Sequence, residues 1–445
     1  MSLRRIFDDY AYGDGPRNGC WWDETCSLPR FPRLEEEITA DVAVIGGGFT
    51  GVSAALRLAE KGVDAVLLEA HEVGWGASGR NGGFCCLGGG KISDKALDLR
   101  FGREERLAYR SAEKAAVAGV AEFISANGLD VDQHSRGETA LAHRPKDMEQ
   151  LRRDAEAVSE NYGVDPRLIE RGDLERHGMQ GGPFFGAMTI PIGFGLNPRK
   201  YLAGLVAAAE QGRARFFAFS PVHAISRRSG KHRLSTPVGK VMADHVIVAT
   251  NGYSSENLPP WVAGRYMPSQ STVHVTRPLT RNELISQGWT TRQMSYDTRH
   301  LLHYFRLMPD NRFLFGMRGG LRTGVRPEAA ARAKTRADFE RMFPAWSKVE
   351  TTHCWSGLVS LARNRLPFVG QVPENPGLWA AMCYHGNGVA MASYAGRMVA
   401  ERVMGRPASE YPLPLQAPMK RFPLGKARRL LMGPLYAGLA LQDRV

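Results

Sequence analysis

Two short apolar segments enclose a glycine-rich stretch near residue 46. Residues 41–45 are apolar and largely β-branched after the first position, which is typical of a buried strand. Residues 52–61 are rich in Ala and Leu and predict a helix that ends at Gly62, and residues 63–70 predict a second strand. The segment therefore predicts a strand–helix–strand unit whose two parallel strands are joined by a right-handed crossover.

Patterns further along the chain predict a second structural part. Ala, Leu, Glu and Arg recur at helical spacing over residues 97–127 and 146–162, and residues 329–342 also predict a helix. Alternating segments at 300–308 and 312–318 predict a second sheet. Since no repeat or low-complexity linker separates the parts, we expect two interwoven domains rather than domains in series.

The stretch GGGFTG contains the spacing G-x-G-x-x-G at Gly46, Gly48 and Gly51. Between a strand and a helix, the first glycine permits a tight turn, the second lets the backbone approach a pyrophosphate, and the third lets the helix pack closely on the strand. Glu69 follows Gly48 by 21 residues, where a carboxylate can accept hydrogen bonds from a ribose. The motif predicts a bound dinucleotide and fits NAD and FAD equally, because both contain adenosine diphosphate.

A second glycine-rich loop follows the second predicted strand. Residues 73–83, VGWGASGRNGG, contain five glycines together with Ser78, Arg80 and Asn81. Such a loop exposes backbone donors where a bulky planar group could approach, although a surface loop would have the same composition.

Composition and charge exclude several other classes of protein. The formal charge is +13, from 58 Lys and Arg against 45 Asp and Glu, but basic and acidic residues are interspersed, so we expect no nucleic-acid partner. The twelve histidines form no H-x-x-x-H or H-E-x-x-H pattern, and the six cysteines form no C-x-x-C pair, so we expect no metal. This cysteine usage favours a reducing, cytoplasmic location.

The sequence predicts neither a secretion signal nor a membrane-spanning segment. The N-terminal residues lack the apolar core of a secretion signal, and no window reaches the roughly 18 apolar residues of a spanning helix. The apolar segment 430–442 is expected to pack on the domain surface, with contact to a membrane surface as the alternative.

Four stretches together resemble a known family, the FAD-dependent amine and amino-acid oxidoreductases related to D-amino-acid oxidase, glycine oxidase and sarcosine oxidase. The similarity is strongest to their bacterial γ-glutamylputrescine oxidase branch. The stretches are residues 41–70, 74–83, 246–255, and 355–370 with 384–396. The resemblance implies an α/β fold, in which a Rossmann-type FAD-binding domain with a parallel sheet is interwoven with an α+β substrate domain carrying a mostly antiparallel sheet. The implied FAD-binding domain is 1–95, 195–260 and 350–445, and the substrate domain is 96–194 and 261–349.

The resemblance also implies which residues hold FAD. They are Gly46, Gly48, Phe49, Thr50, Gly51, Glu69, Ala70, Ser78, Arg80, Asn81, Gly82, Gly83, Val222, Thr250, Asn251, Gly252, Gly386, Asn387, Gly388 and Val389. Sarcosine oxidases attach FAD through a cysteine before the last domain, and Cys354 lies a few residues from that point, so we expect noncovalent FAD. A basic residue that follows the last G-x-G in those enzymes is replaced here by Val389, which argues against a small N-methyl amino acid as substrate.

The chemistry implied by the resemblance is oxidation of a C–N bond by hydride transfer to the flavin. The expected substrate is a small amine or amino acid, and the expected acceptor is oxygen or another oxidant. Candidate substrate-side residues are His303, Tyr304, Arg318, Trp355 and His385. Two alternatives remain open: a flavin subunit of a larger amine dehydrogenase complex, and a tRNA-modifying flavoenzyme.

Overall fold

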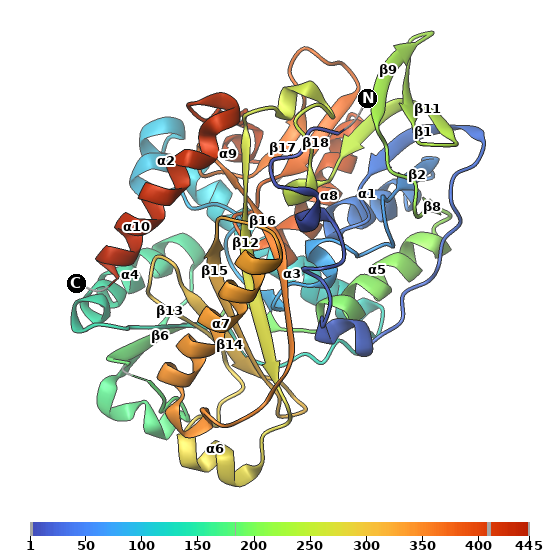
Figure 1. Cartoon of the computed structure of the whole chain (residues 1–445). Coiled ribbons are helices and arrows are strands. Elements are labelled where there is room, and N and C mark those ends of the chain that lie inside the picture. Colours follow the sequence, from blue (N-terminus) through green and yellow to red (C-terminus); the bar gives the residue numbers. More distant parts are fainter. Residues whose placement is uncertain (1–2, 183, 407–410, 444–445) are drawn as a thin grey trace.

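The computed structural model describes residues 3–182, 184–406 and 411–443. Two eight-stranded sheets form its frame (Figure 1). The first has the strand order β17-β18-β11-β1-β2-β8, with β10 and β9 continuing from β11 as antiparallel neighbours. Its strands are β1 (Glu37–Ile45), β2 (Ala65–Leu68), β8 (Arg215–Phe217), β9 (Ala224–Arg228), β10 (Lys231–Ser235), β11 (Lys240–Val248), β17 (Phe368–Gln371) and β18 (Leu378–Met382).

The centre of this first sheet is parallel. β1 pairs in parallel with both β11 and β2, β2 with β8, and β11 with β18. β2 and the last residues of β1 and β11, 42–45 and 246–248, are buried on both faces and form continuous apolar runs, as parallel strands do. Helices α1 (Phe49–Ala59), α3 (Arg103–Ala126), α5 (Pro198–Gln211) and α8 (Gly388–Val403) pack together beside it, and their apolar residues join those of β1 and β2 in one core.

The second sheet has the order β16-β12-β15-β14-β13-β4-β6-β5. All of its pairings are antiparallel except that of β13 with β4. Its strands are β4 (Glu138–Leu141), β5 (Arg167–Glu170), β6 (Gly186–Ile190), β12 (Tyr266–Thr276), β13 (Met294–Asp297), β14 (His303–Leu307), β15 (Phe313–Gly320) and β16 (Thr351–Ala362). The predicted fold class is therefore confirmed.

The chain passes repeatedly between the two sheets. The remaining elements are α2 (Asp94–Phe101), α4 (Pro145–Tyr162), α6 (Arg281–Gln287), α7 (Val325–Met342), α9 (Leu413–Gln416), α10 (Met432–Gln442) and the short pair β3 (Phe84–Cys85) and β7 (Phe194–Gly195). β16 lies in the second sheet, although the predicted boundaries placed residues 350–445 with the nucleotide-binding part. The division of the chain into domains stays a prediction.

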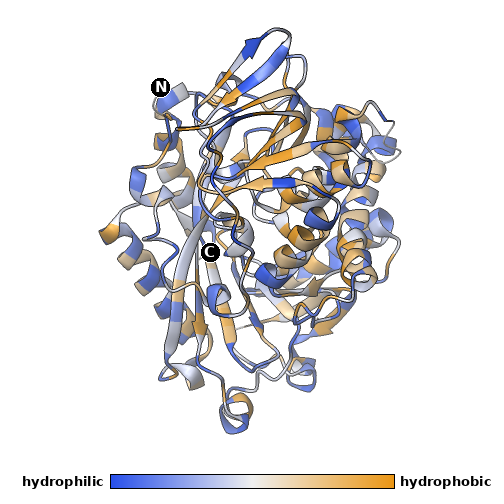
Figure 2. Ribbon diagram, turned by 90° about the vertical axis from the view of Figure 1, so that its right-hand side faces the viewer, coloured by the Kyte–Doolittle hydropathy of each residue, from blue (hydrophilic) through white to orange (hydrophobic). Residues whose placement is uncertain are grey.

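Apolar residues gather on the strands and on the helix faces turned toward them (Figure 2). One face of the second sheet is covered by α7 through a cluster of aromatic rings. Phe343 lies at its centre, with its ring 4.9 Å from that of Phe313 and 5.4 Å from that of Trp346. All three side chains are fully buried. This packing makes the covered face a rigid support for whatever the opposite face carries.

We expect Phe343→Ala to lower the stability of the protein by about 3–5 kcal/mol, because it removes a buried ring from a closely packed cluster. Phe219→Ala is the matched control, since Phe219 is 52% exposed and should be nearly neutral. Thermal unfolding followed by circular dichroism compares the two. Equal melting temperatures for both variants would contradict a structural role for this cluster.

Candidate active site

The three glycines of the G-x-G-x-x-G spacing lie in the turn between β1 and α1 and at the start of α1, and two of them lie close to neighbouring backbone. Gly46 has a φ of +112°, and a Cβ there would lie 2.9 Å from the carbonyl oxygen of Ala249. A Cβ on Gly51 would overlap the carbonyl oxygen of Gly46. Gly48 is the N-cap of α1, so the first N–H groups of the helix and its positive dipole end face the space beside the turn.

Glu69 lies directly after β2 and faces the same turn. Its carboxylate accepts hydrogen bonds from the backbone N–H groups of Gly47, at 2.6 Å, and His71, at 3.0 Å. Burial raises the pKa of Glu69, while these donors oppose the rise. The two contacts fix the carboxylate at the edge of the space into which the helix N-terminus points.

The loop of residues 73–83 is held in shape by its own polar groups. The Arg80 guanidinium donates to the Trp75 and Ser356 carbonyl oxygens and packs over the Trp75 ring at 4.4 Å. The indole N–H of Trp355 donates to the carbonyl oxygen of Arg80 at 2.7 Å. Asn81 receives the N–H of Gly83 on its side-chain oxygen. Arg80 and Trp355 therefore position this loop.

A second helix N-terminus faces the same space from the other side. α8 begins at Gly388, after the residues 386–387. Asn387 donates to the carbonyl oxygen of Leu87 at 2.8 Å and accepts a hydrogen bond from Arg318 at 3.0 Å. Arg318 also donates to the carbonyl oxygen of His385. Burial lowers the pKa of Arg318, which has no carboxylate among its described hydrogen-bond partners.

These elements enclose a single cavity of about 580 Å³ that continues to the second sheet. Of the predicted FAD-binding residues, Gly51, Gly83 and Gly252 do not line it, and the other seventeen do: Gly46, Gly48, Phe49, Thr50, Glu69, Ala70, Ser78, Arg80, Asn81, Gly82, Val222, Thr250, Asn251, Gly386, Asn387, Gly388 and Val389. Gly51 and Gly83 instead lie where the backbone packs tightly against carbonyl oxygens.

The uncovered face of the second sheet forms the wall opposite the glycine turn. Side chains on one face of a sheet come from alternate residues of each strand and from residues paired across strands. The register pairs Tyr304 with Tyr296 and with Gly316, and it pairs Arg318 with Ser271. The Tyr304 hydroxyl lies 2.9 Å from the Ser271 hydroxyl. All five residues except Gly316 line the cavity.

Tyr304 lies against the loop of residues 73–83. A Cβ on Gly82 would come within 2.7 Å of the Tyr304 ring, so only a glycine leaves room there for both groups. Burial raises the pKa of Tyr304, and its hydroxyl therefore stays protonated at neutral pH. Of the predicted substrate-side residues, Tyr304 and Arg318 line the cavity.

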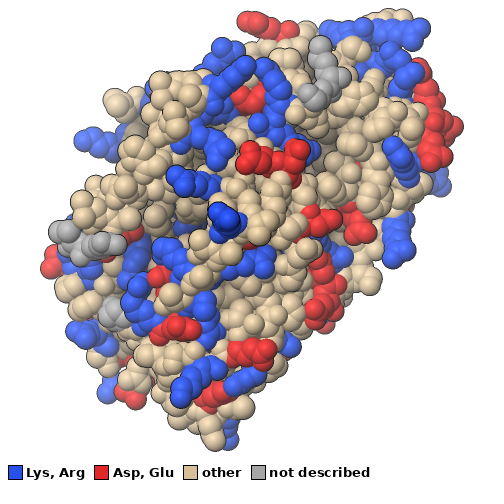
Figure 3. All heavy atoms as spheres, in the orientation of Figure 1, with Lys and Arg blue, Asp and Glu red and all other residues tan. Residues whose placement is uncertain are grey.

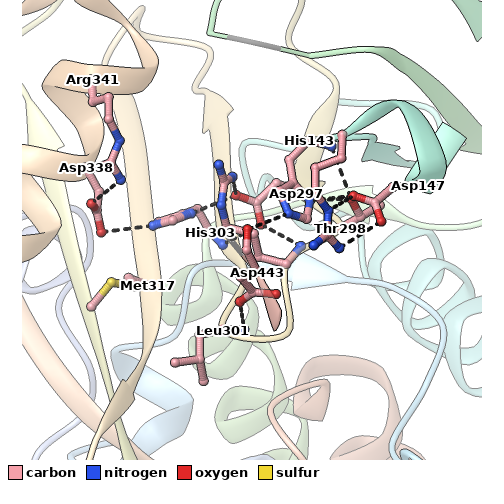
Figure 4. Close-up of polar contacts among 12 residues, drawn as sticks. His143, Asp147, Asp297, Thr298, Leu301, His303, Met317, Asp338, Arg341 and Asp443 are labelled. Atoms are coloured by element: carbon pink, nitrogen blue, oxygen red, sulfur yellow. Dashed lines mark hydrogen bonds and ion pairs between the residues drawn. The ribbon is translucent and has the colours of Figure 1, made fainter. Parts of the chain in front are cut away.

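The structure does not bring His303 to the cavity. As the neighbour of Tyr304 on β14, it points to the opposite face, where it lies between two carboxylates. Its Nδ1 is 2.7 Å from Asp297 and its Nε2 is 3.1 Å from Asp338, and these partners raise its pKa against the effect of burial (Figure 4). His303 therefore holds β13, β14 and α7 together.

His385 and Trp355 are also absent from the cavity lining. The Nε2 of His385 accepts the N–H of Ala362 at 3.1 Å, which leaves its Nδ1 to donate to the carbonyl oxygen of Gly89 at 3.0 Å. Burial lowers the pKa of His385 to about 4. A neutral ring with both nitrogens engaged has no capacity left to take a proton, so His385 supports the loop at residue 89.

The cavity lining includes several charged residues that sequence reasoning missed: Arg5, Lys91, Asp94, Arg110, Glu113, Glu138 and Asp154. Arg110 forms ion pairs with Asp94 and Glu113, whereas Lys91 and Glu138 form none among the described residues. Lys91 keeps accessible surface because it faces the cavity, and burial together with Arg318 lowers its pKa to about 8. Glu138 is 6% exposed, and burial raises its pKa to about 7. No clear signal marked Glu138, because it is the first residue of the four-residue strand β4 and is followed by Thr139; only the structure shows that all four are buried.

The cavity fits a flavin dinucleotide. The N-terminus of α1 and Glu69 match a pyrophosphate and a ribose, and the N-terminus of α8 offers N–H groups to a second polar region. The part of the cavity that Gly82, Tyr304 and Asn387 line can take a planar ring.

Comparisons with known proteins agree with this fit. The family described as DAO, FAD dependent oxidoreductase, matches residues 41–402. Gamma-glutamylputrescine oxidoreductase of Escherichia coli (strain K12) is 30% identical, over 93% of this chain and 95% of its own length. Probable oxidoreductase OrdL of Rhizobium meliloti (strain 1021) is 31% identical, over 95% and 97%.

The fold itself resembles solved structures. Glycine oxidase of Geobacillus kaustophilus superposes with a TM-score of 0.69 and 20% identity, over 85% of this chain and 98% of that chain. Iminodiacetate oxidase of Chelativorans sp. BNC1 has the same TM-score at 18% identity, over 85% and 98%. Because the family matches most of its length, the chain belongs to the DAO family of FAD-dependent oxidoreductases.

Proposed function

We propose that this protein oxidises the C–N bond of an amine or amino acid. The observation that carries the proposal is the single cavity that joins the dinucleotide cradle to a polar wall on the second sheet. The relatives named gamma-glutamylputrescine oxidoreductase and glycine oxidase support an amine or amino-acid substrate. When bound, FAD supplies the acceptor for the hydride that leaves the carbon next to nitrogen.

The chain's own residues orient the substrate beside that acceptor. We assign Tyr304 and Arg318 to the substrate side, because both reach the cavity from the sheet wall next to Gly82 and Asn387. The aromatic face of Tyr304 packs against an alkyl group, and Arg318 attracts a carboxylate. Loss of a hydride and a proton converts the amine to an imine, which water hydrolyses to a carbonyl compound and ammonia or an amine.

Lys91 and Glu138 extend the substrate site beyond Arg318. Each feels the other's charge, yet neither forms an ion pair with any residue that the structure describes. Burial raises the pKa of the Glu138 carboxyl, while Lys91, Leu87 and Cys86 oppose that rise. The Lys91 ammonium, which is accessible from the cavity, and the buried Glu138 carboxylate share this cavity without an ion pair, so each is free to bind an opposite charge on a ligand. We infer that the preferred substrate carries a charged group at the end remote from the oxidised carbon.

Several finer points stay predictions. We predict that oxygen or another oxidant accepts the electrons from the reduced flavin, and that the protein is cytoplasmic. Noncovalent FAD is supported by the position of Cys354, which lies within β16 and does not line the cavity.

The purified protein should show the absorption bands of a flavin, and one or more amines should bleach them in the absence of air. A panel of amines and amino acids, added anaerobically, checks this, and readmitted air then shows whether oxygen is the acceptor. A protein that takes up no FAD, or a bound flavin that no amine bleaches, would contradict the proposed function.

Glu69→Gln should weaken FAD binding about tenfold, since it removes the charge that strengthens a hydrogen bond to the ribose. Titration of the apoprotein with FAD, followed by flavin fluorescence, gives the dissociation constant. Glu72→Gln is the matched control, because Glu72 is exposed three residues away and does not line the cavity. Equal FAD affinities for the two variants would show that Glu69 does not contribute to FAD binding.

Four amines test Lys91 and Glu138 separately. Pentylamine has no second charge, 6-aminohexanoate has a distal carboxylate, cadaverine has a distal ammonium, and L-lysine has both. Lys91→Met should lower kcat/KM about 10- to 100-fold for 6-aminohexanoate and lysine alone, and Glu138→Gln should do so for cadaverine and lysine alone. Assays at pH 7.5 keep both groups mostly charged.

Controls for these variants are Lys95→Met and Glu122→Gln, which alter exposed residues outside the cavity. An equal loss for all four amines would assign Lys91 and Glu138 a structural role only. That result would leave the oxidation of amines itself untouched, because the unaltered protein's activity on pentylamine reports on it.

A further inference from the structure

The segment from Leu424 to Leu441 exposes an unusual number of apolar side chains. Leu424 is 59% exposed, Leu430 72%, Leu435 53% and Leu441 62%, and Leu431 also lies at the surface. These five are clustered in eighteen consecutive residues, while exposed large apolar side chains are scattered singly over the rest of the described chain. Single exposed leucines are ordinary, but a contiguous apolar surface marks a contact with something else.

One side of this segment is already packed against the protein. The Tyr436 hydroxyl lies 3.0 Å from the Ser269 hydroxyl, and the carboxylate of Asp443 accepts hydrogen bonds from the backbone N–H groups of His300 and Leu301 (Figure 4). These contacts fasten α10 along the edge of the molecule (Figure 1). A helix that is apolar on all sides is normally buried. α10 is such a helix, yet its outward leucines contact no other part of the described protein that would shield them from water.

Basic residues predominate in this segment of the chain. Residues 411–442 contain no Asp or Glu and five basic residues. Arg428 is buried in an ion pair with Glu256, whereas Lys420, Arg421 and Lys426 are exposed. Arg429 donates to the carbonyl oxygen of Leu321, which brings the exposed Arg322 and Arg326 alongside. Figure 3, in the orientation of Figure 1, shows mainly uncharged and basic side chains over this region.

We propose that α10 and the 3-10 helix before it, Gly425–Leu431, dock on the surface of an anionic lipid bilayer. The outward leucines enter the boundary between headgroups and acyl chains, and the exposed Lys and Arg contact the anionic headgroups. No described helix is long and apolar enough to cross a membrane. The eleven residues of α10 therefore lie along the surface.

A second copy of the chain fits this surface less well. A symmetric dimer through α10 would place the same basic residues of both copies against each other, with no acidic residue of residues 411–442 to compensate. Phosphate and carboxylate headgroups provide the opposite charge over an area that is flat enough to meet a protruding helix. Charge complementarity therefore favours an anionic bilayer over a second copy of the chain as the partner of this surface.

Cosedimentation of the full-length, FAD-loaded protein with vesicles tests the proposal. Vesicles of phosphatidylcholine with 30% phosphatidylglycerol should carry the protein down at 50 mM salt, whereas pure phosphatidylcholine vesicles should not. Binding should fall at least tenfold at 0.5 M salt, because the headgroup attraction is screened.

Variants separate the apolar contribution from the basic one. Leu430→Ser with Leu435→Ser should weaken binding to the mixed vesicles at least tenfold, and Lys426→Gln should weaken it about fivefold. Leu99→Ser is the control, because Leu99 is 86% exposed and outside this surface. Flavin absorbance and melting temperature confirm that each variant remains folded.

Two results would overturn the proposal. One is equal binding of the leucine variant and the Leu99 control to mixed vesicles. The other is a dimer, seen by light scattering during size-exclusion chromatography, that dissociates in the leucine variant while vesicles bind neither form. Neither result bears on amine oxidation, which the flavin bleaching assay measures in the absence of lipid.

Discussion

Close backbone contact between helices and strands at glycines is the constraint on which this site depends. Gly51 lets α1 pack directly on the turn at Gly46, and Gly396 of α8 packs against the carbonyl oxygen of Thr50 on α1. Any side chain at either glycine would push the helices apart. With both glycines in place, the N-termini of α1 and α8 converge on one cavity, and their unpaired N–H groups give it two regions suited to negative charge. The dinucleotide cradle is therefore a consequence of helix packing.

The second sheet supplies the other half of the site through the alternation of its side chains. Tyr304 and Arg318 face the cavity, while Phe313 and Phe315 face α7 and fill the aromatic core. The same rule separates His303 from its neighbour Tyr304 and places it between two carboxylates. The densely packed back face supports the front face, where Glu138 of β4 lines the cavity, while Lys91 reaches the same cavity from the loop between β3 and α2. Because Lys91 and Glu138 do not pair with each other, both remain available to bind charged groups of a ligand.

At the edge of the molecule, α10 is also attached to the second sheet by only a few contacts. α10 is fastened by Tyr436 and Asp443 on its inner side, and its outer side remains apolar among basic residues. The second sheet thus supports the substrate cavity through β15 and the surface helix through Ser269 of β12. The substrate wall and the proposed membrane contact share one scaffold.

The sequence by itself determined the parts whose physics is local. The glycine spacing, the acidic residue after the second strand and the helical and alternating periodicities were enough for the fold class and for most of the cradle, because each depends on neighbours within a few residues or one turn. Only the tertiary structure decided which side chains meet across strands that are far apart in the chain. Glu138 of β4, Tyr296 of β13 and Lys91 converge because of strand order and register, which a single sequence does not encode in any short pattern. For the same reason His303, His385 and Trp355 were placed on the substrate side from sequence, whereas long-range hydrogen bonds hold them in supporting positions.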